Sequence, residues 1–363
     1  MQSGEKMNSI GFDLFSQNKL FEHIAVGASV YSSPEVINSE HFLWKHLQNP
    51  YGPSTSISLR NASEELAGRS FIQPRTFWVT PSISCRGATI TDLVIMPAER
   101  NAASLISMTR AIKSPDGIDV VVHTSNDSSD LIYRKLFKFP IAFTLAATGL
   151  PLRVSNILKP HFTNSALIKV AELLVSPWRW LLRASALVMG AVSDVKFAAE
   201  PSDSVMSEIF EEYRHHAGAH FERSQRFLKW RFSEGPLFNG KIEWVWRQGE
   251  CLGYLAFKQV TLGGLVVFVI MDAVLRRRLT LKEAIAIKFL VARLAIDGSC
   301  DAVFTLVNTE NSALKWLKGF PFFHIPDSHL PHSTPIFIHA SNEHRSLEKQ
   351  VDVFFTLADL DYF

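Results

Sequence analysis

A turn between a buried strand and a helix is the first place where the residues could do chemistry. It spans residues 97–105 (Pro-Ala-Glu-Arg-Asn-Ala-Ala-Ser-Leu) and follows the apolar run 88–96. The first N–H groups of a helix have no partner within the helix, and the helix dipole adds positive potential there. Such a turn attracts anions, phosphates above all. The sequence therefore predicts an anion site at this turn, beside Arg100.

Two aspartates offer acid–base or charge chemistry. Asp92 and Asp272 each lie near the end of a predicted buried strand. A carboxylate in that position could orient an amine substrate or accept a proton from it. It could equally cap a neighbouring turn. From the sequence both interpretations stay open for both residues.

The elements that position these residues are repeated along the chain. Five pairs recur in the same order at offsets of 180 to 186 residues: Trp44 and Trp230, Gly68 and Gly253, Asp92 and Asp272, Asp116 and Asp297, and Asn126 and Asn308. Such self-similarity at a near-constant offset indicates a duplicated structural unit. In each half an apolar strand leads into an amphipathic helix and then a short strand, an order that predicts a parallel right-handed crossover.

The domain boundaries follow from this repeat. We expect a first domain over residues 1–155, a helical linker over 156–195 and a second domain over 196–363. Asn164 is a favourable N-cap, and Ser176-Pro177 resembles a second helix start, which predicts two short helices in the linker. The segment 351–357 is predicted to be a strand that completes the second sheet.

Composition narrows the class of protein. Lys and Arg number 37 against 35 Asp and Glu, so the net charge of +2 gives no reason to expect a nucleic-acid partner. Three dispersed cysteines and the histidines at 215, 216 and 220 give no convincing metal-ligand pattern, so no metal is expected. With no signal peptide and no apolar run of spanning length, a cytoplasmic protein is expected, starting at Met1 or Met7.

The order of these elements and the residues of the anion turn resemble the GNAT superfamily of acyl-CoA N-acyltransferases. The resemblance is to tandem members of the kind found near bacterial polysaccharide gene clusters. In the family motif Gln/Arg-x-x-Gly-x-Gly/Ala, Arg100 matches the first position, Ala103 replaces the first glycine and Leu105 departs from the second. The resemblance implies an α/β (α+β) fold of two domains, each a mixed, mostly antiparallel sheet with a parallel central strand pair and flanking helices.

The resemblance also implies the roles of particular residues. The turn Arg100, Asn101, Ala102, Ala103 and Ser104 would hold the pyrophosphate of acetyl-CoA or another acyl-CoA. Asn126 would contact the pantetheine arm. Tyr133, seven residues later, would protonate the departing thiolate. Asp92 is the second candidate catalytic residue because of its place at the end of a strand, where it would orient the amine or act as a base.

The second half is predicted to be the poorer cofactor site. Lys315 stands where the tyrosine is expected, and no glycine precedes the helix. Thr280 and Glu283 form a capping-box pattern that would occupy the N–H groups a phosphate needs, and the carboxylate would repel the phosphate. We therefore expect acyl-CoA in the first half.

The leading hypothesis is an N-acetyltransferase of GNAT type acting on a small-molecule or glycan amine, such as an amino sugar or a cell-surface polymer precursor. Two alternatives remain open: a catalytically inactive tandem scaffold or ligand-binding protein, and an aminoacyl-tRNA-dependent transferase of the peptidoglycan-bridging type. Trp178, Arg179, Trp180 and Arg183 could contact a membrane surface, although a helix packed between two domains is favoured.

Overall fold

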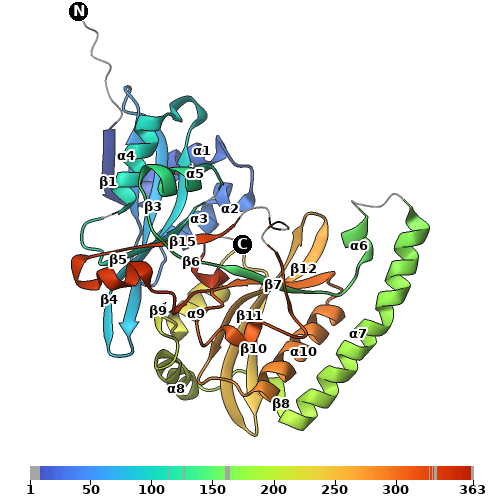
Figure 1. Ribbon diagram of the computed structural model, residues 1–363. Helices are drawn as coiled ribbons and strands as arrows, with labels where there is room; N and C mark the ends of the chain where they lie inside the picture. The colour runs from blue at the N-terminus through green and yellow to red at the C-terminus, as the bar shows by residue number, and fades with distance from the viewer. Residues whose placement is uncertain are drawn as a thin grey trace, which may run out of the picture.

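Two mixed β-sheets lie side by side in the computed structural model, each flanked by helices (Figure 1). The structure describes residues 9–360, except 114, 126, 160–163, 327, 329, 331 and 332. The predicted fold class is confirmed, because each sheet is mainly antiparallel and contains a parallel central pair.

The first sheet has nine strands. Along its main path these are β1 (Ser9–Leu14), β2 (Thr55–Arg60), β3 (Leu66–Thr80), β4 (Ile83–Ile95), β5 (Val120–Thr124), β15 (Pro335–Ala340) and β6 (Ile141–Thr144), while β9 (Ala219–Phe221) pairs with β3 and with β16 (Val353–Phe354). The helices of this half are α1 (Leu20–Ala28), α2 (Pro34–Ile37), α3 (Ser39–His46), α4 (Ala102–Lys113), α5 (Asp127–Leu131) and the short π-helix η3 (Ile132–Leu136).

The second sheet has seven strands. In spatial order they are β14 (Phe323–His324), β7 (Ala146–Pro151), β13 (Ala302–Val307), β12 (Leu265–Leu275), β11 (Glu250–Leu262), β10 (Gly240–Arg247) and β8 (Val195–Ala198). Its helices are α6 (Ser155–Leu158), α7 (Ser165–Ser193), α8 (Asp203–Arg214), α9 (Gln225–Phe232) and α10 (Leu281–Asp297). The largest buried apolar cluster lies mostly in this half and includes Phe257, Ile287 and Val303.

The two halves exchange strands. β7 follows β6 directly in the chain but pairs with β13 of the second sheet, whereas β15, late in the chain, lies between β5 and β6 of the first. Sheet membership therefore crosses the predicted domain limits in both directions. The segment 351–357 was predicted to complete the second sheet. It instead contains the two-residue strand β16, which pairs with β9 in the first sheet.

Two repeated tryptophans join the halves. Trp44 of α3 and Trp230 of α9 stack at 4.9 Å between ring centroids. Each indole N–H donates a hydrogen bond to the backbone carbonyl of the other tryptophan, at 3.0 and 3.2 Å. Both helices also begin with a side-chain cap, Asn38 in one and Ser224 in the other. This reciprocal pairing places the two copies of the repeat against each other.

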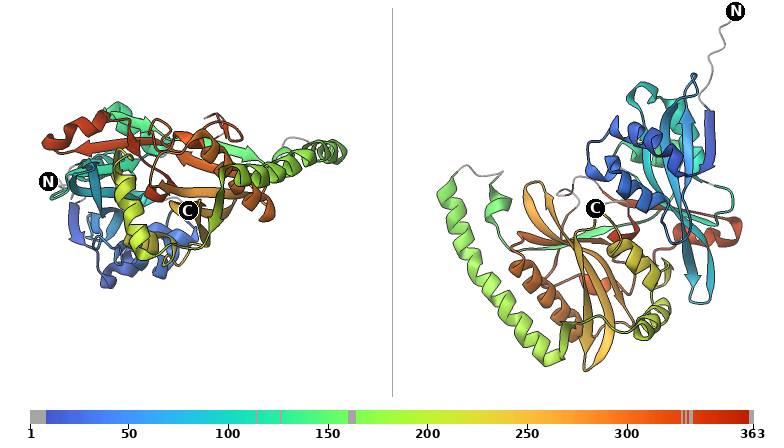
Figure 2. Two further views of the ribbon diagram at one scale, coloured as in Figure 1. Left: turned by 90° about the horizontal axis from the view of Figure 1, so that it is seen from below. Right: turned by 180° about the vertical axis from the view of Figure 1, so that it is seen from behind.

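One long helix replaces the two short helices predicted for the linker. α7 runs from Ser165 to Ser193 with Pro177 inside it, and Asn164 caps its start as predicted. It packs along α10 at the outer edge of the second half (Figures 1 and 2). A proline inside a helix removes one backbone hydrogen bond, and here the packing along α10 keeps the helix continuous.

Candidate active site

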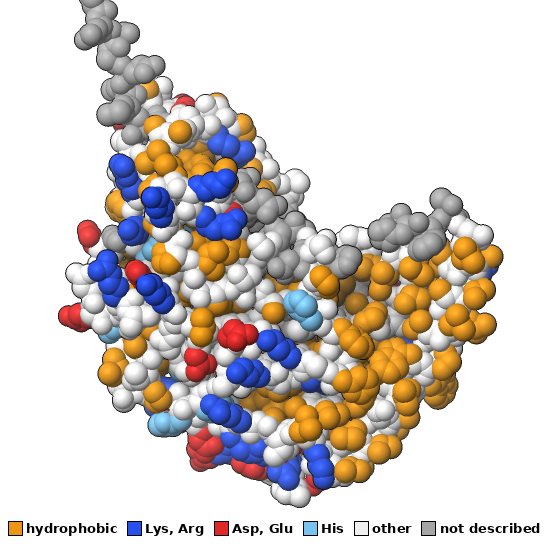
Figure 3. Space-filling model, in the orientation of Figure 1, with side chains coloured by type: hydrophobic (Ala, Val, Ile, Leu, Met, Phe, Trp, Pro, Cys, Tyr) orange, Lys and Arg blue, Asp and Glu red, His pale blue; other side chains and the backbone are white. Residues whose placement is uncertain are grey.

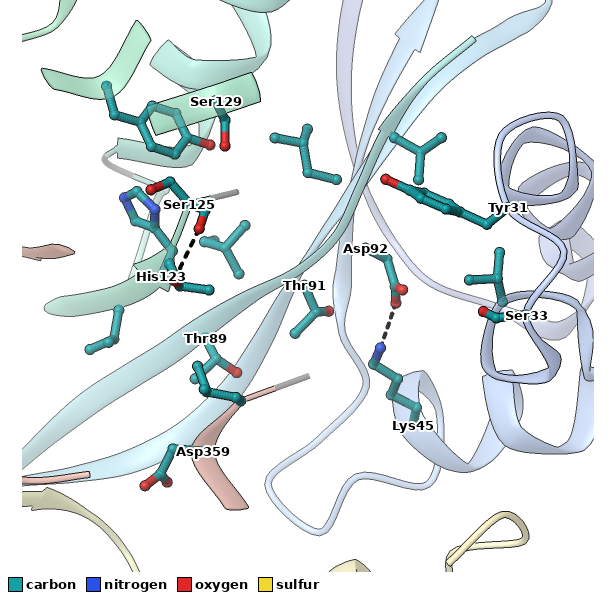
Figure 4. Close-up of a pocket in the computed structure, with 18 of the residues that line it drawn as sticks. Tyr31, Ser33, Lys45, Thr89, Thr91, Asp92, His123, Ser125, Ser129 and Asp359 are labelled. Carbon is teal, nitrogen blue, oxygen red and sulfur yellow. Dashed lines mark hydrogen bonds and ion pairs between the residues drawn. The ribbon is translucent and has the colours of Figure 1, made fainter. Parts of the chain in front are cut away.

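A cavity opens in the first half where the two parallel strands separate. β4 and β5 pair only from Gly87 to Thr89 of β4, and beyond that point the edge of β4 facing β5 has no ladder partner among the described residues. The cavity has a volume of about 420 Å³. Its walls come from β4, β5, the α1–α3 region, η3 and the C-terminal segment, as Figure 4 shows.

Asp92 sits at an irregularity in β4. The pairing of β3 with β4 changes register between Arg69 and Phe71, opposite Asp92, and Asp92 has a positive φ of 53°. The bulge turns the carboxylate toward α3, where Lys45 Nζ lies 2.8 Å from its Oδ2 (Figure 4). His46 Nε2 lies 2.7 Å from the same oxygen. Neither α3 residue was among the predicted site residues; the only signal in the sequence was the base that follows each repeated tryptophan.

The contact with Lys45 and His46 keeps the carboxyl group of Asp92 ionised. Burial raises the pKa of the Asp92 carboxyl, but the Lys45 ammonium and the hydrogen bond from His46 outweigh burial and hold the pKa well below its usual range. Burial also lowers the pKa of His46 to about 4, so its ring is neutral at pH 7. An ionised Asp92 with a depressed pKa is a weak proton acceptor. It is better suited to orienting a hydrogen-bond donor or a cationic group than to accepting a proton.

Tyr133 lies on the opposite wall of the same cavity. Its side chain is 2% exposed and packs edge-on against His123, with 5.0 Å between the ring centroids. Burial raises the pKa of the phenol above its usual value, so the hydroxyl stays protonated at neutral pH. Ser125 and Ser129 add two hydroxyls to this wall, and Ser125 Oγ donates to Asp130 at 3.2 Å. The structure thus brings Tyr133 and Asp92 to one cavity.

The predicted anion turn is not part of the cavity wall. Asn101, Ala102 and Ala103 are exposed at the start of α4, beyond the end of β4. The Asn101 side chain caps the helix, accepting a hydrogen bond of 2.9 Å from the Ser104 N–H. Arg100 Nη2 donates to the Ile95 carbonyl at 3.1 Å. Asn126, the predicted pantetheine contact, lies outside the described residues.

The corresponding place in the second half is filled by protein. Asp272 is buried and accepts hydrogen bonds from Arg223 at 2.9 Å, Tyr254 at 2.8 Å and Thr356 at 2.8 Å. Asp359 pairs with Arg223 at 2.7 Å, and its segment, residues 353–360, packs into this core. Of the two interpretations left open for Asp272, the structural one fits these contacts.

Side chains of the protein also occupy the start of α10. Thr280 and Glu283 form both hydrogen bonds of a capping box, as predicted. Glu283 also pairs with Arg277 at 2.8 Å and with Arg247 at 3.0 Å. Although burial raises the pKa of Glu283, the Arg277 hydrogen bond and those from Thr280 lower it to about 2. A permanent carboxylate at this helix start opposes phosphate binding.

No group of three or more His, Cys, Asp or Glu side chains in the described part of the chain is placed to hold a metal ion.

Comparison with known proteins identifies the fold. No family model and no curated protein matches the sequence. A GCN5-related N-acetyltransferase from Anabaena variabilis ATCC 29413 matches in structure with a TM-score of 0.57 and 13% identity, over 94% of this chain and 75% of that protein. A probable N-acyltransferase from Enterococcus faecalis V583 matches with a TM-score of 0.50 and 10% identity, over 92% of this chain and 71% of that one.

Saccharomyces cerevisiae N-myristoyltransferase, solved with bound myristoyl-CoA, matches over 96% of this chain and 90% of its own length, with a TM-score of 0.53 and 13% identity. At these identities the likeness is one of fold. The chain therefore shares the fold of these N-acetyltransferase and N-myristoyltransferase structures, with two mixed sheets that each contain a parallel pair.

Proposed function

We propose that this protein is an acyl-CoA-dependent N-acyltransferase whose single acyl-CoA site is in the first half. The observation that carries the proposal is the cavity between the separated strands β4 and β5, which has Asp92 on one wall and Tyr133 on another. The structural likeness to a GCN5-related N-acetyltransferase and to an N-myristoyltransferase supports the reaction class. Fold alone does not identify an activity; the side chains of this cavity carry the proposed chemistry.

An acyl-CoA supplies an acyl group as a thioester, which an amine attacks at the carbonyl carbon. Beyond Thr89 the edge of β4 toward β5 has no ladder partner among the described residues, and backbone N–H groups on that edge would stabilise the negative charge on the carbonyl oxygen. As the amide C–N bond forms and the thioester C–S bond breaks, Tyr133 can give its proton to the departing thiolate and regain one from the attacking nitrogen, so that amide and free thiol form with no net change in protons. Asp92, held by Lys45, would orient the amine.

The start of α4 fits the phosphate end of the donor. Ala102 and Ala103 are small and exposed, so a phosphate can approach the backbone, and Arg100 supplies positive charge beside them. In the second half Glu283 occupies the equivalent helix start, and the segment 353–360 fills the core around Asp272. Both differences favour one site per chain.

A specific observation favours an alternative, a binding protein without turnover. Asn101 already occupies the Ser104 N–H, one of the donors that a phosphate would use. Acyl-CoA affinity would then be modest, and the protein could hold its ligand without transferring the acyl group.

Release of free thiol separates the two functions. We would incubate the full-length protein with acetyl-CoA, and separately with myristoyl-CoA, in the presence of amino sugars and small primary amines. A transferase releases CoA thiol at a rate that depends on the amine. Binding of acyl-CoA without any amine-dependent release would contradict the proposal and support the ligand-binding alternative.

A further inference from the structure

The side of α7 that faces away from the protein is apolar along its whole length. We call this surface the outer face of α7. Each of its large side chains is more than half exposed: Leu167, Val170, Leu173, Leu174, Trp180, Leu181, Leu187, Val188 and Val192. Figure 3 shows hydrophobic side chains gathered over this helix. Exposed patches of this kind mark interaction surfaces.

The opposite side of the same helix is apolar too. Ile168, Leu182 and Ala186 are buried, and α7 packs along α10. A helix on the surface of a water-soluble domain normally carries polar residues on its outer side. The outer face of α7 therefore needs an apolar environment beyond the one that α10 supplies.

The charged residues of α7 lie along one border of the outer face. At 3.6 residues per turn, Lys169, Glu172, Arg179 and Arg183 fall within about 80° of one another around the helix axis. Three of the four are basic. A helix with a broad apolar side and basic residues at its edge is typical of one that lies in the interface of a membrane.

A groove of about 430 Å³ adjoins this border. Arg153, Arg179 and Arg183 line it together with Trp180 and Asp297. Arg179 pairs with Glu172 at 2.9 Å and Arg183 pairs with Asp297 at 2.7 Å. Three guanidinium groups and one carboxylate, Asp297, thus line the groove, so it stays positive even with Glu172 paired to Arg179 and can take a phosphate through forked hydrogen bonds.

We propose that α7 docks the protein on an anionic phospholipid membrane, with the outer face in the lipid and a headgroup phosphate in the arginine groove. The helix would lie on the membrane, because no helix among the described residues is long and apolar enough to cross one. Trp180, 73% exposed beside the groove, would sit at headgroup depth. Trp178, by contrast, packs against Phe320 and takes no part.

The apolar contribution is tested by vesicle co-sedimentation of the full-length protein. The double variant Leu174→Gln/Trp180→Gln should bind vesicles of phosphatidylcholine and phosphatidylglycerol at least about tenfold more weakly than wild type. The matched control Leu14→Gln/Phe21→Gln changes two equally exposed apolar residues of the first half and should bind as wild type does. Equal loss in both variants would contradict the proposal.

Other variants test whether a headgroup phosphate binds in the arginine groove. Arg153→Gln/Arg183→Gln should weaken binding to the anionic vesicles, whereas Arg110→Gln on α4 should not, and added salt should weaken wild-type binding. Equal affinity for vesicles of phosphatidylcholine alone would overturn the headgroup assignment. A lipid-independent dimer in analytical ultracentrifugation that Leu174→Gln/Trp180→Gln dissociates, without vesicle binding, would assign the outer face to a second copy instead. None of these outcomes depends on acyl transfer.

Discussion

Tyr133 and Tyr31 line the same cavity and form a matched pair of variants. If Tyr133 protonates the thiolate, Tyr133→Phe should lower the turnover number about 100-fold, a typical effect for a general acid. Tyr31→Phe, which removes a hydroxyl from the other side of the cavity, should leave turnover nearly unchanged. Steady-state thiol release measures both, and an equal effect of the two substitutions would remove Tyr133 from the reaction.

The buried ion pair of Asp92 makes a prediction about stability. Asp92→Asn leaves the Lys45 ammonium without its carboxylate and should lower the free energy of unfolding at pH 7 by about 3–5 kcal/mol. Urea unfolding of wild type and variant measures this difference. Asp13→Asn is the control, because Asp13 pairs with Lys19 at the surface, where ion pairs contribute little.

The ion pair between Asp92 and Lys45 also determines how the free energy of unfolding changes with pH. The pKa of Asp92 is lower in the folded protein than in the unfolded chain, where it is about 3.9. Its contribution to stability is therefore complete above pH about 4 to 5 and is lost as the pH falls through the folded value. The difference between wild type and Asp92→Asn should shrink in acid; a difference that grew on acidification would contradict the ion-pair account.

The site was only partly predictable from single residues. Asp92 and Tyr133 were identified from sequence position and family resemblance, and they do share a cavity. Lys45 and His46 were not, because they reach Asp92 only through a bulge in β4 at which Asp92 adopts a positive φ. Local sequence patterns do not encode such a long-range contact.

At the level of elements, the capping box of α10 gives a stability prediction. Thr280→Ala removes the side-chain oxygen that accepts the Glu283 N–H and should cost about 1 kcal/mol of unfolding free energy. Thr280→Ser keeps the oxygen and should remain close to wild type. Thermal or urea unfolding distinguishes the two variants, and identical stability of Thr280→Ala and wild type would show that the cap is not needed.

Elements with a strong local pattern were predictable and those governed by packing were not. The strand–helix–strand order predicted for the second half is present as β12, α10 and β13, because each of these elements has a strong local apolar pattern. α7 was predicted as two helices because Ser176-Pro177 carries a helix-start signal. Packing along α10 overrides that local preference, as tertiary contacts often do.

At the level of the whole molecule, the exchanged strands predict that the halves do not fold separately. A fragment of residues 1–155 would keep β7 without its partner β13 and would lose β15 from between β5 and β6. Unpaired strand edges favour aggregation. The fragment should show no cooperative urea transition by circular dichroism, whereas the full chain should; a cooperative fragment would contradict the strand exchange.

The duplication was visible in the sequence, but the exchange was not. Each repeat carries its own strand–helix–strand pattern, so the repeats could be aligned. Which sheet β7 and β15 join depends on contacts between segments far apart in the chain. The stacked pair Trp44 and Trp230 shows the same limit, since the repeat identifies both tryptophans but not their contact with each other.

Calorimetric titration of the full-length protein with acetyl-CoA tests the central claim most directly. The account predicts one site per chain, lost in Arg100→Glu and kept in the control Arg110→Glu, which reverses an exposed charge further along α4. Two sites per chain would show that the capping box at Thr280 and Glu283 does not exclude the ligand from the second half. No binding at millimolar acetyl-CoA, repeated with myristoyl-CoA, would contradict an acyl-CoA site in the first half.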